Sequence, residues 1–232
     1  MFKKSLIATA LLAGLVAPAA AADLFIPQVV IEPELFSWSS CYVGVGIEYT
    51  TGETTSEFPF SDYFTEPSGP GLSPRAGCDW QMPDSPVVLG VVTDLTIRSV
   101  EDTRDVVAGP PTQTLSTSMP WAGTIRARAG IAADTTLFYV TGGLAVANIE
   151  QNLVVAGLLD TTAENTQWGW TVGGGVEMMV TDNIALFAEY LYTDLGEDDY
   201  TFAGADFDGA GLDTLPFSST NHTIKVGVNY RF

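Results

Sequence analysis

The chain has 232 residues, of which 46% are hydrophobic and only 16% charged, whereas soluble domains carry roughly 25% charged residues. The mean hydropathy of +0.21 would suit a bundle of membrane helices, yet after the N-terminus no run approaches the roughly 18 apolar residues that a spanning helix needs. Twenty-eight acidic against nine basic residues give a net charge of −19, whose field repels a phosphate backbone and excludes nucleic-acid binding.

Residues 1–22 have the features of a secretory signal peptide. Lys3 and Lys4 precede an apolar stretch from Leu6 to Val16, and an Ala-rich cleavage site follows. Removing the peptide takes away two lysines and no acid, which leaves seven basic residues against 28 acidic ones. We therefore expect an exported chain that is even more acidic than its precursor.

Eight stretches of the exported chain alternate between apolar side chains on one face and small or polar ones on the other. Trp121 and Ile125, for example, oppose Arg126 and Arg128, and the alternation through 223–232 has no interruption. A period of two residues is typical of β-strands with two different faces. The predicted strands are, in chain order, 41–50, 75–82, 86–97, 119–131, 136–149, 166–179, 184–195 and 221–232.

Short and long connections alternate between these strands, most of which approach the roughly 9 to 11 residues of a tilted membrane-spanning strand. The short turns are 82–86, 132–136 and 181–183, and the long polar links are 51–74, 98–118, 150–165 and 196–219. Membrane barrels combine short periplasmic turns with longer extracellular loops. We therefore predict an all-β fold, an eight-stranded antiparallel up-and-down transmembrane β-barrel over 41–232. Residues 23–40 are then an N-terminal periplasmic segment, and both termini lie in the periplasm. The alternative is a secreted soluble β-sandwich.

Aromatic residues near both ends of the predicted strands resemble the two interfacial girdles of membrane barrels. The expected girdle residues are Tyr49, Trp121, Trp168 and Tyr192 at the loop side and Trp80 and Tyr139 at the turn side. The stretch 136–149, which holds Tyr139, is apolar on both faces, so its register stays open.

Several fragments resemble the small outer-membrane β-barrel (porin-like) proteins of Gram-negative bacteria, which are related to the membrane domain of OmpA. The fragments are FSWSSCYVGVGIEY, WAGTIRARAGIA, LFYVTGGLAVA, WTVGGGVEMMVTDNIALFAEYLYTDLG and HTIKVGVNYRF, and they cover most of the chain from Phe36 onward. The resemblance implies an outer-membrane location. It also implies that Tyr230 and Phe232 form the signal read by the barrel-assembly machinery, a transient partner.

The sequence departs from this family at a few positions. Cys41 or Cys78 stands where the family usually has an aromatic residue, and Val92 stands near the place of an acidic one, where only Asp94 remains. We expect no periplasmic peptidoglycan-binding domain of the OmpA type, so a direct tether to the cell wall is not implied.

Charged residues occupy the inferred inner face of the barrel in equal numbers of acids and bases. The expected lumen charges are Glu48, Asp94, Glu177 and Glu189 with Arg126, Arg128, Lys225 and Arg231. Charges in a narrow lumen must be paired or hydrated, and eight strands leave an interior just wide enough for side chains. We expect a salt-bridge network that closes the lumen, and the alternative is a gate or small ion path.

The remaining candidate sites predict no catalytic residue, no metal ligand and no cofactor. The segment 205–213 is acidic but lacks the full spacing of a calcium loop. His222 is the sole histidine, and serines beside it in sequence do not establish a catalytic arrangement. Cys41 and Cys78 come close if strands one and two pair, which leaves a disulfide and two free thiols as open alternatives.

The sequence favours a non-enzymatic integral outer-membrane barrel that has a structural role in the envelope and displays acidic loops outside the cell. A small-solute or ion channel is the first alternative, and a surface adhesin or ligand-binding barrel is the second. The expected partners are outer-membrane lipid and lipopolysaccharide, and the sequence does not determine the oligomeric state.

Overall fold

The computed structural model describes residues 36–58, 61–99, 101–107, 113–155, 159–201 and 214–232. The predicted signal peptide 1–22, most of the segment 23–40 and the central part of the acidic link 196–219 lie outside the described residues. Within the described ranges, no helix is long and apolar enough to cross a membrane.

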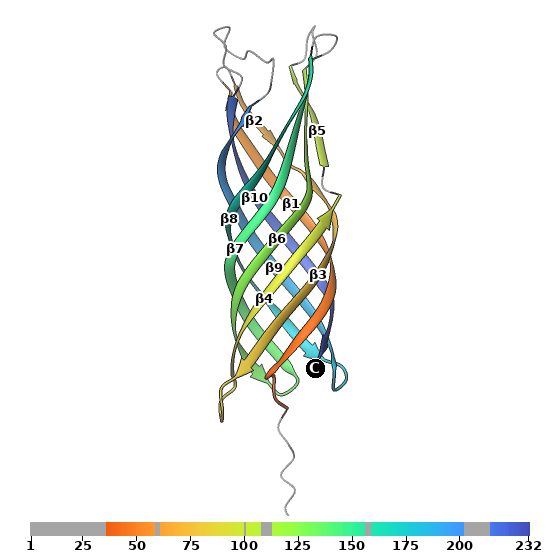
Figure 1. The fold of residues 1–232 in the computed structure, drawn as a ribbon, viewed down its shortest axis with the longest axis vertical. Helices are drawn as coiled ribbons and strands as arrows, with labels where there is room; N and C mark the ends of the chain where they lie inside the picture. The colour runs from red at the N-terminus through yellow and green to blue at the C-terminus, as the bar shows by residue number, and fades with distance from the viewer. Residues whose placement is uncertain (1–35, 59–60, 100, 108–112, 156–158, 202–213) are drawn as a thin grey trace, which may run out of the picture. The chain divides into compact units, whose positions relative to one another are not determined.

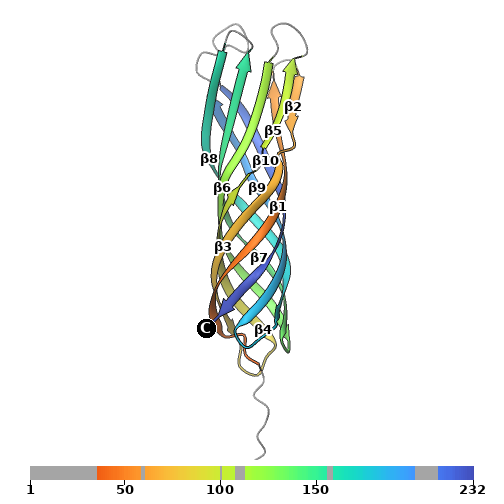
Figure 2. The ribbon, with the colours of Figure 1, turned by 90° about the vertical axis from the view of Figure 1, so that its right-hand side faces the viewer.

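Ten strands occur in the described residues, and eight of them form a closed antiparallel ring (Figures 1 and 2). The ring runs in the order β1, β3, β4, β6, β7, β8, β9, β10 and closes because β10 pairs with β1. The predicted eight-stranded up-and-down barrel is therefore confirmed. The ring strands are β1 (Ser40–Phe58), β3 (Ser68–Gln81), β4 (Val87–Arg98), β6 (Gln113–Ala133), β7 (Thr136–Val155), β8 (Leu159–Met179), β9 (Ile184–Thr201) and β10 (Thr214–Arg231).

The strands extend well into the segments that the sequence analysis treats as long polar links. β6, β7 and β8 extend six or seven residues beyond the strand ends predicted from alternation, and Gln113 still pairs with Val155. Two short strands, β2 (Ser61–Thr65) and β5 (Glu101–Val107), add to β1 and β6 at the same end. Hydrophobic alternation marks only the part of a strand that has two different environments, so it does not reveal where polar pairing continues.

Short turns define one end of the barrel, here called the turn end, and the opposite end is called the loop end. The turn end holds the connections 82–86, 134–135 and 180–183, all of them short as predicted. Asp84 and Asp134 adopt positive φ angles of 53° and 55° there. Aspartate tolerates this left-handed conformation better than most residues, which suits tight connections between neighbouring strands.

The two faces of the ring strands differ sharply in polarity. Large apolar side chains point outward over the central part of the barrel, whereas charged and polar side chains point inward. This is the reverse of a soluble barrel and suits a wall in contact with lipid. The outward apolar band consists of Val43, Val45, Ile47, Leu72, Val91, Leu95, Ile97, Ile125, Ile131, Phe138, Val140, Leu144, Val172, Met178, Leu186, Ile224, Val226 and Val228.

The two cysteines lie directly opposite each other on β1 and β3, and the structure joins them in a disulfide. Both belong to the outward alternation near the turn end, because Tyr42 and Asp79 beside them point inward. The bond therefore links β1 and β3 near the turn end, at the opposite end of the two strands from their connection.

A charge placed in the outward apolar band tests its contact with lipid. We expect Leu144→Lys to lower the free energy of unfolding by about 2–4 kcal/mol in lipid vesicles, because the ammonium group would be buried in hydrocarbon. Thr166→Lys is the matched control, since Thr166 is also exposed on the outer wall but lies towards the loop end. Urea titration of the vesicle-embedded protein measures both changes. Equal losses for the two variants would contradict the assignment of the band.

Candidate functional site

Cross-strand register brings lumen charges of opposite sign to the same level of the barrel. Lys225 on β10 lies opposite Glu48 of β1 on one side and opposite Glu189 of β9 on the other. In the same way Arg75 on β3 lies opposite Asp94 on β4. All eight lumen charges named from the sequence are buried in the interior: Glu48, Asp94, Arg126, Arg128, Glu177, Glu189, Lys225 and Arg231.

The charges separate into two groups, and the group nearer the loop end is called the loop-side cluster. Its members are Glu48, Asp94, Glu189, Arg75, Arg98, Arg126 and Lys225. Arg126 donates to Asp94 and, at 2.7 Å, to Glu189. The Lys225 ammonium lies 3.0 Å from Asp94 and 3.2 Å from Glu48. The Asp94 carboxylate therefore joins neighbouring strands through shared cations rather than through isolated pairs.

The turn-side cluster consists of Asp79, Glu177, Arg128 and Arg231, and each arginine contacts both carboxylates. Arg128 lies 2.6 Å from Asp79 and 3.0 Å from Glu177, and Arg231 lies 2.6 Å and 2.8 Å from the same two groups. Fork-shaped guanidinium donors suit such shared carboxylates. The four side chains thus close a ring of ion pairs across the lumen.

Aromatic rings lie against the arginines of both clusters. Arg128 lies 4.6 Å from the ring centre of Tyr139 and 5.3 Å from that of Tyr42. Arg75 lies over the Phe187 ring at 4.1 Å. Contacts between a cation and the face of an aromatic ring stabilise guanidinium groups that have lost their hydrating water. Charged and aromatic side chains together line the lumen at the level of the two clusters.

Trp38 closes the lumen at the turn end. Its side chain is fully buried, packs in a cluster with Val88, Leu137 and Met179, and its indole N–H donates to the backbone carbonyl of Asp134. Its backbone carbonyl accepts from Arg231 at 2.9 Å. The residues that immediately precede β1 thus pack into the barrel, although the sequence analysis assigns them only to an N-terminal periplasmic segment.

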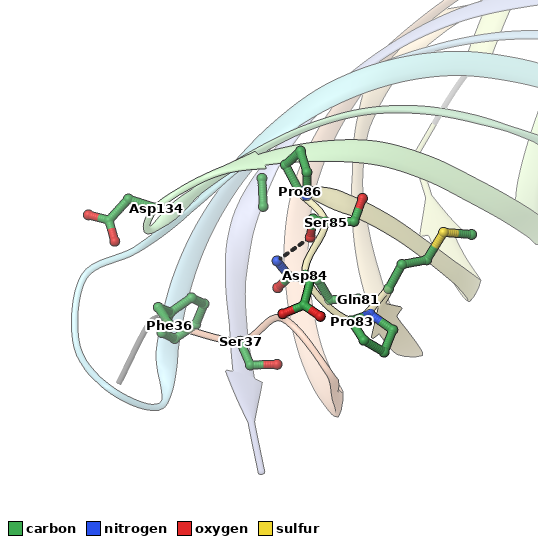
Figure 3. Close-up of a pocket in the computed structure, with 10 residues that line it drawn as sticks. Phe36, Ser37, Gln81, Pro83, Asp84, Ser85, Pro86 and Asp134 are labelled. Carbon is green, nitrogen blue, oxygen red and sulfur yellow. Dashed lines mark hydrogen bonds between the residues drawn. The ribbon is translucent and has the colours of Figure 1, made fainter. Parts of the chain in front are cut away.

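A pocket lies outside this closure, between the turn that follows β3 and residues Phe36 and Ser37 (Figure 3). Asp84 and Asp134 also line it, and a hydrogen bond from the Gln81 side-chain amide to the Ser85 carbonyl shapes its wall. Its ten lining residues include no histidine, cysteine or lysine. They hold no nucleophile paired with a base, so the pocket offers no catalytic arrangement.

Apolar and polar side chains together occupy the lumen at the loop end. The apolar ones are Met119, Ala147, Ile149, Ala163, Leu195, Tyr200 and Phe217, and buried polar side chains such as Thr117, Gln151 and Gln167 lie among them. The Tyr200 ring packs edge-on against Phe217 with ring centres 5.4 Å apart. Burial and the nearby Asp198 carboxylate raise the pKa of the Tyr200 phenol, so it stays uncharged. The charged clusters therefore lie between an apolar layer at the turn end and a mixed apolar and polar layer at the loop end.

Sequence reasoning missed four side chains that the lumen contains: Tyr42, Arg75, Asp79 and Arg98. Arg75 and Asp79 share a face with Gly77, opposite Cys78 and Trp80. That alternation was a usable signal in the printed sequence. The stretch is short and mostly polar, however, and its apolar face is too sparse to mark the strand as clearly as the others.

Five of the six expected girdle residues lie on the outer wall, and the sixth lies in the lumen. Tyr49, Trp80, Trp121 and Trp168 are exposed, and Tyr192 is partly exposed. Tyr139 points into the lumen, where it is only 4% exposed, so its assignment to a girdle is wrong. β7 has apolar side chains on both faces because its inner face contributes to the turn-end cluster around Trp38.

His222 and the C-terminal residues lie on the outer wall. The Tyr190 hydroxyl and His222 Nδ1 are hydrogen bonded at 2.7 Å, whereas Ser219 is buried in the lumen and bonded to Thr54. His222 and Ser219 therefore do not form a nucleophile–base pair. Tyr230 and Phe232 point outward at the turn end, and their role as an assembly signal stays a prediction.

Removing one member of the loop-side cluster tests the shared ion pairs. We expect Glu189→Ala and Arg126→Ala each to lower the free energy of unfolding by about 3–5 kcal/mol, because each leaves a buried charge without its partner. The double variant should lose less free energy of unfolding than the sum of the two single losses, because Glu189 and Arg126 share one interaction. Urea titration in vesicles measures the cycle, with exposed Glu164→Ala as a control expected to change stability by no more than about 0.5 kcal/mol. Additive losses would contradict the pairing.

Comparisons with known proteins agree on one family. The family model described as the outer membrane protein beta-barrel domain matches residues 7–232. The 31 kDa outer-membrane immunogenic protein of Brucella melitensis is 34% identical over 99% of this chain and 100% of its own length. The 22 kDa outer membrane protein of Rhizobium leguminosarum is 30% identical over 84% of this chain and 79% of its own.

The crystal structure of the outer membrane protein OprG from Pseudomonas aeruginosa has a similar fold. It matches with a TM-score of 0.57 at 12% sequence identity, over 84% of this chain and 97% of its own. At that identity the likeness concerns the fold alone. The family match, the curated relatives and the outward apolar band lead to one conclusion: the chain belongs to the outer membrane protein beta-barrel domain family, and it is an outer-membrane β-barrel protein.

Proposed function

We propose that this protein is a closed structural barrel of the outer membrane, which supports the envelope and displays its loop end outside the cell. The turn end then faces the periplasm, as short turns do in other membrane barrels. Outer-membrane lipid and lipopolysaccharide are its permanent surroundings. The barrel-assembly machinery is a transient partner that reads Tyr230 and Phe232, both exposed on the outer wall.

The filled lumen is the observation that carries this proposal. Trp38 and its cluster occupy the turn end, two charged clusters occupy the middle, and apolar side chains such as Phe217 together with polar ones such as Gln151 occupy the loop end. Moving any one of these layers would break buried ion pairs or remove packed apolar side chains. A continuous aqueous path through all of them is therefore costly.

The names of the relatives support display at the surface. The Brucella relatives are called outer-membrane immunogenic proteins. In this chain β6, β7 and β8 extend beyond the apolar band at the loop end, where exposed carboxylates such as Glu164 and Glu197 lie. An acidic loop end suits contact with water and opposes adhesion to polyanionic surfaces.

A small-ion channel is the second candidate, and unpartnered polar atoms in the lumen favour it. Among the described residues, both side-chain amide atoms of Gln167 and the amide nitrogen of Gln151 are buried with no hydrogen-bond partner. Such groups are commonly satisfied by internal water, which is the first requirement of an ion path.

Conductance separates the two candidates. For a closed barrel we expect no single-channel events from folded protein in a planar bilayer, and none from Arg126→Ala or Glu189→Ala. Gel migration with and without boiling is the control for folding, because folded membrane barrels resist detergent until heated. Discrete events from the wild type that change in either variant would overturn the closed barrel in favour of the channel.

Antibody access tests the orientation. An epitope inserted between Thr201 and Thr214 should be labelled on intact cells, because it extends the connection at the loop end. The matched control is the same epitope inserted in the connection 180–183, which should be labelled only after the outer membrane is permeabilised. The reverse pattern would show that the turn end is outside.

A further inference from the structure

The loop-side cluster carries an unbalanced charge. Among the described side chains it contains four cations, Arg75, Arg98, Arg126 and Lys225, against three carboxylates, Glu48, Asp94 and Glu189. The turn-side cluster is balanced, with two arginines and two carboxylates. An uncompensated charge in a buried site costs several kcal/mol, so the extra cation requires a counterion or extensive hydration.

Arg75 is the cation that lacks a close partner. Its side chain has no exposed surface, and within the described residues none of its three guanidinium nitrogens has a hydrogen-bond partner. The nearest carboxylate oxygens, on Glu189 and Asp94, lie 3.6 Å and 3.9 Å away. Arg126 holds those same two carboxylates in hydrogen bonds. Arg75 thus contributes charge to the cluster while its five N–H groups are not used.

Two phenol groups near Arg75 are also unpartnered. Tyr42 and Tyr139 are buried, and within the described residues neither hydroxyl has a hydrogen-bond partner. The Arg75 guanidinium lies 5.9 Å from the ring centre of Tyr42 and 3.6 Å from Glu189, which lies opposite Gly175 beside the Tyr139 hydroxyl. Gly77 and Gly175 let these hydroxyls lie against the barrel wall, since a Cβ there would approach them to 2.5 Å and 2.7 Å. Buried donors of this kind require an acceptor.

We propose that the lumen binds a small monovalent anion, of which chloride is the probe, against the Arg75 guanidinium, with the Tyr42 and Tyr139 hydroxyls as further donors. A single negative charge balances the loop-side cluster, and an anion accepts hydrogen bonds from all three side chains. The anion is enclosed between the two charged clusters, so it enters while the barrel folds. It is a structural ligand of the closed barrel.

Refolding in two salts tests the site. Wild type refolded in sodium chloride should have an unfolding equilibrium constant about tenfold lower than wild type refolded in sodium gluconate at equal ionic strength. That factor is expected when the anion is present at roughly ten times its dissociation constant. Gluconate is too large for a fully enclosed site. Arg75→Gln should remove the difference between the salts.

Arg98→Gln is the matched control, because it removes one positive charge from the same cluster but Arg98 already donates to Glu48 at 2.9 Å. Arg98→Gln should keep most of the difference in unfolding equilibrium constant between the two salts, because the unpartnered N–H donors of Arg75 remain. A crystal grown in bromide gives a second readout that needs no variant, an anomalous peak within hydrogen-bond distance of Arg75. Equal stability of the wild type in both salts, or a bromide derivative with no such peak, would overturn the proposal.

Discussion

The loss of water around charges in the lumen is the constraint on which the rest of the barrel depends. Lys225 lies opposite Glu48 and Glu189 across two strand pairs. Its ammonium pairs with Glu48 and Asp94, whereas Glu189 pairs with Arg126, so these charges find their partners only in one register. A shift of one residue in any strand would turn the lumen charges of that strand towards lipid and its outward apolar side chains inward. The ion pairs and the apolar band therefore select the same register independently. This agreement supports a single native pairing more strongly than either feature would alone.

Apolar side chains limit the access of water at both ends of the barrel, as a cluster at the turn end and among polar side chains at the loop end. Trp38 excludes water at the turn end and also accepts a hydrogen bond from Arg231 through its backbone carbonyl. At the loop end the Tyr200 ring packs edge-on against Phe217, where the strands have passed the apolar band. The charged clusters thus lie in an environment of low polarity, where each ion pair is stronger and each unpaired charge costs more. This arrangement supports the proposed closed barrel over a channel.

Much of this arrangement could be predicted from the sequence, and the failures have physical causes. Strict alternation placed all eight named charges in the lumen, because a strand between lipid and a charged interior has two very different faces. Tyr139 was misplaced because β7 is apolar on both faces, one against lipid and one against Trp38. Arg75 and Asp79 were missed because their strand has few apolar residues to mark its outer face. The extent of the strands beyond the band was not predictable, since pairing between polar segments leaves no hydrophobic period.

The distribution of charge explains how a chain of net charge −19 can have a buried excess of cations. Of the seven basic residues after position 22, six lie in the lumen, and the seventh, Arg104, lies on β5, where the structure does not describe its side chain. The outer wall that the structure describes therefore has carboxylates, such as Glu53 and Glu164, without neighbouring cations. Attraction to anionic headgroups cannot come from that part of the wall. Its anchoring at the interfaces depends on uncharged amphipathic groups, which are the exposed tryptophans and tyrosines of the two girdles.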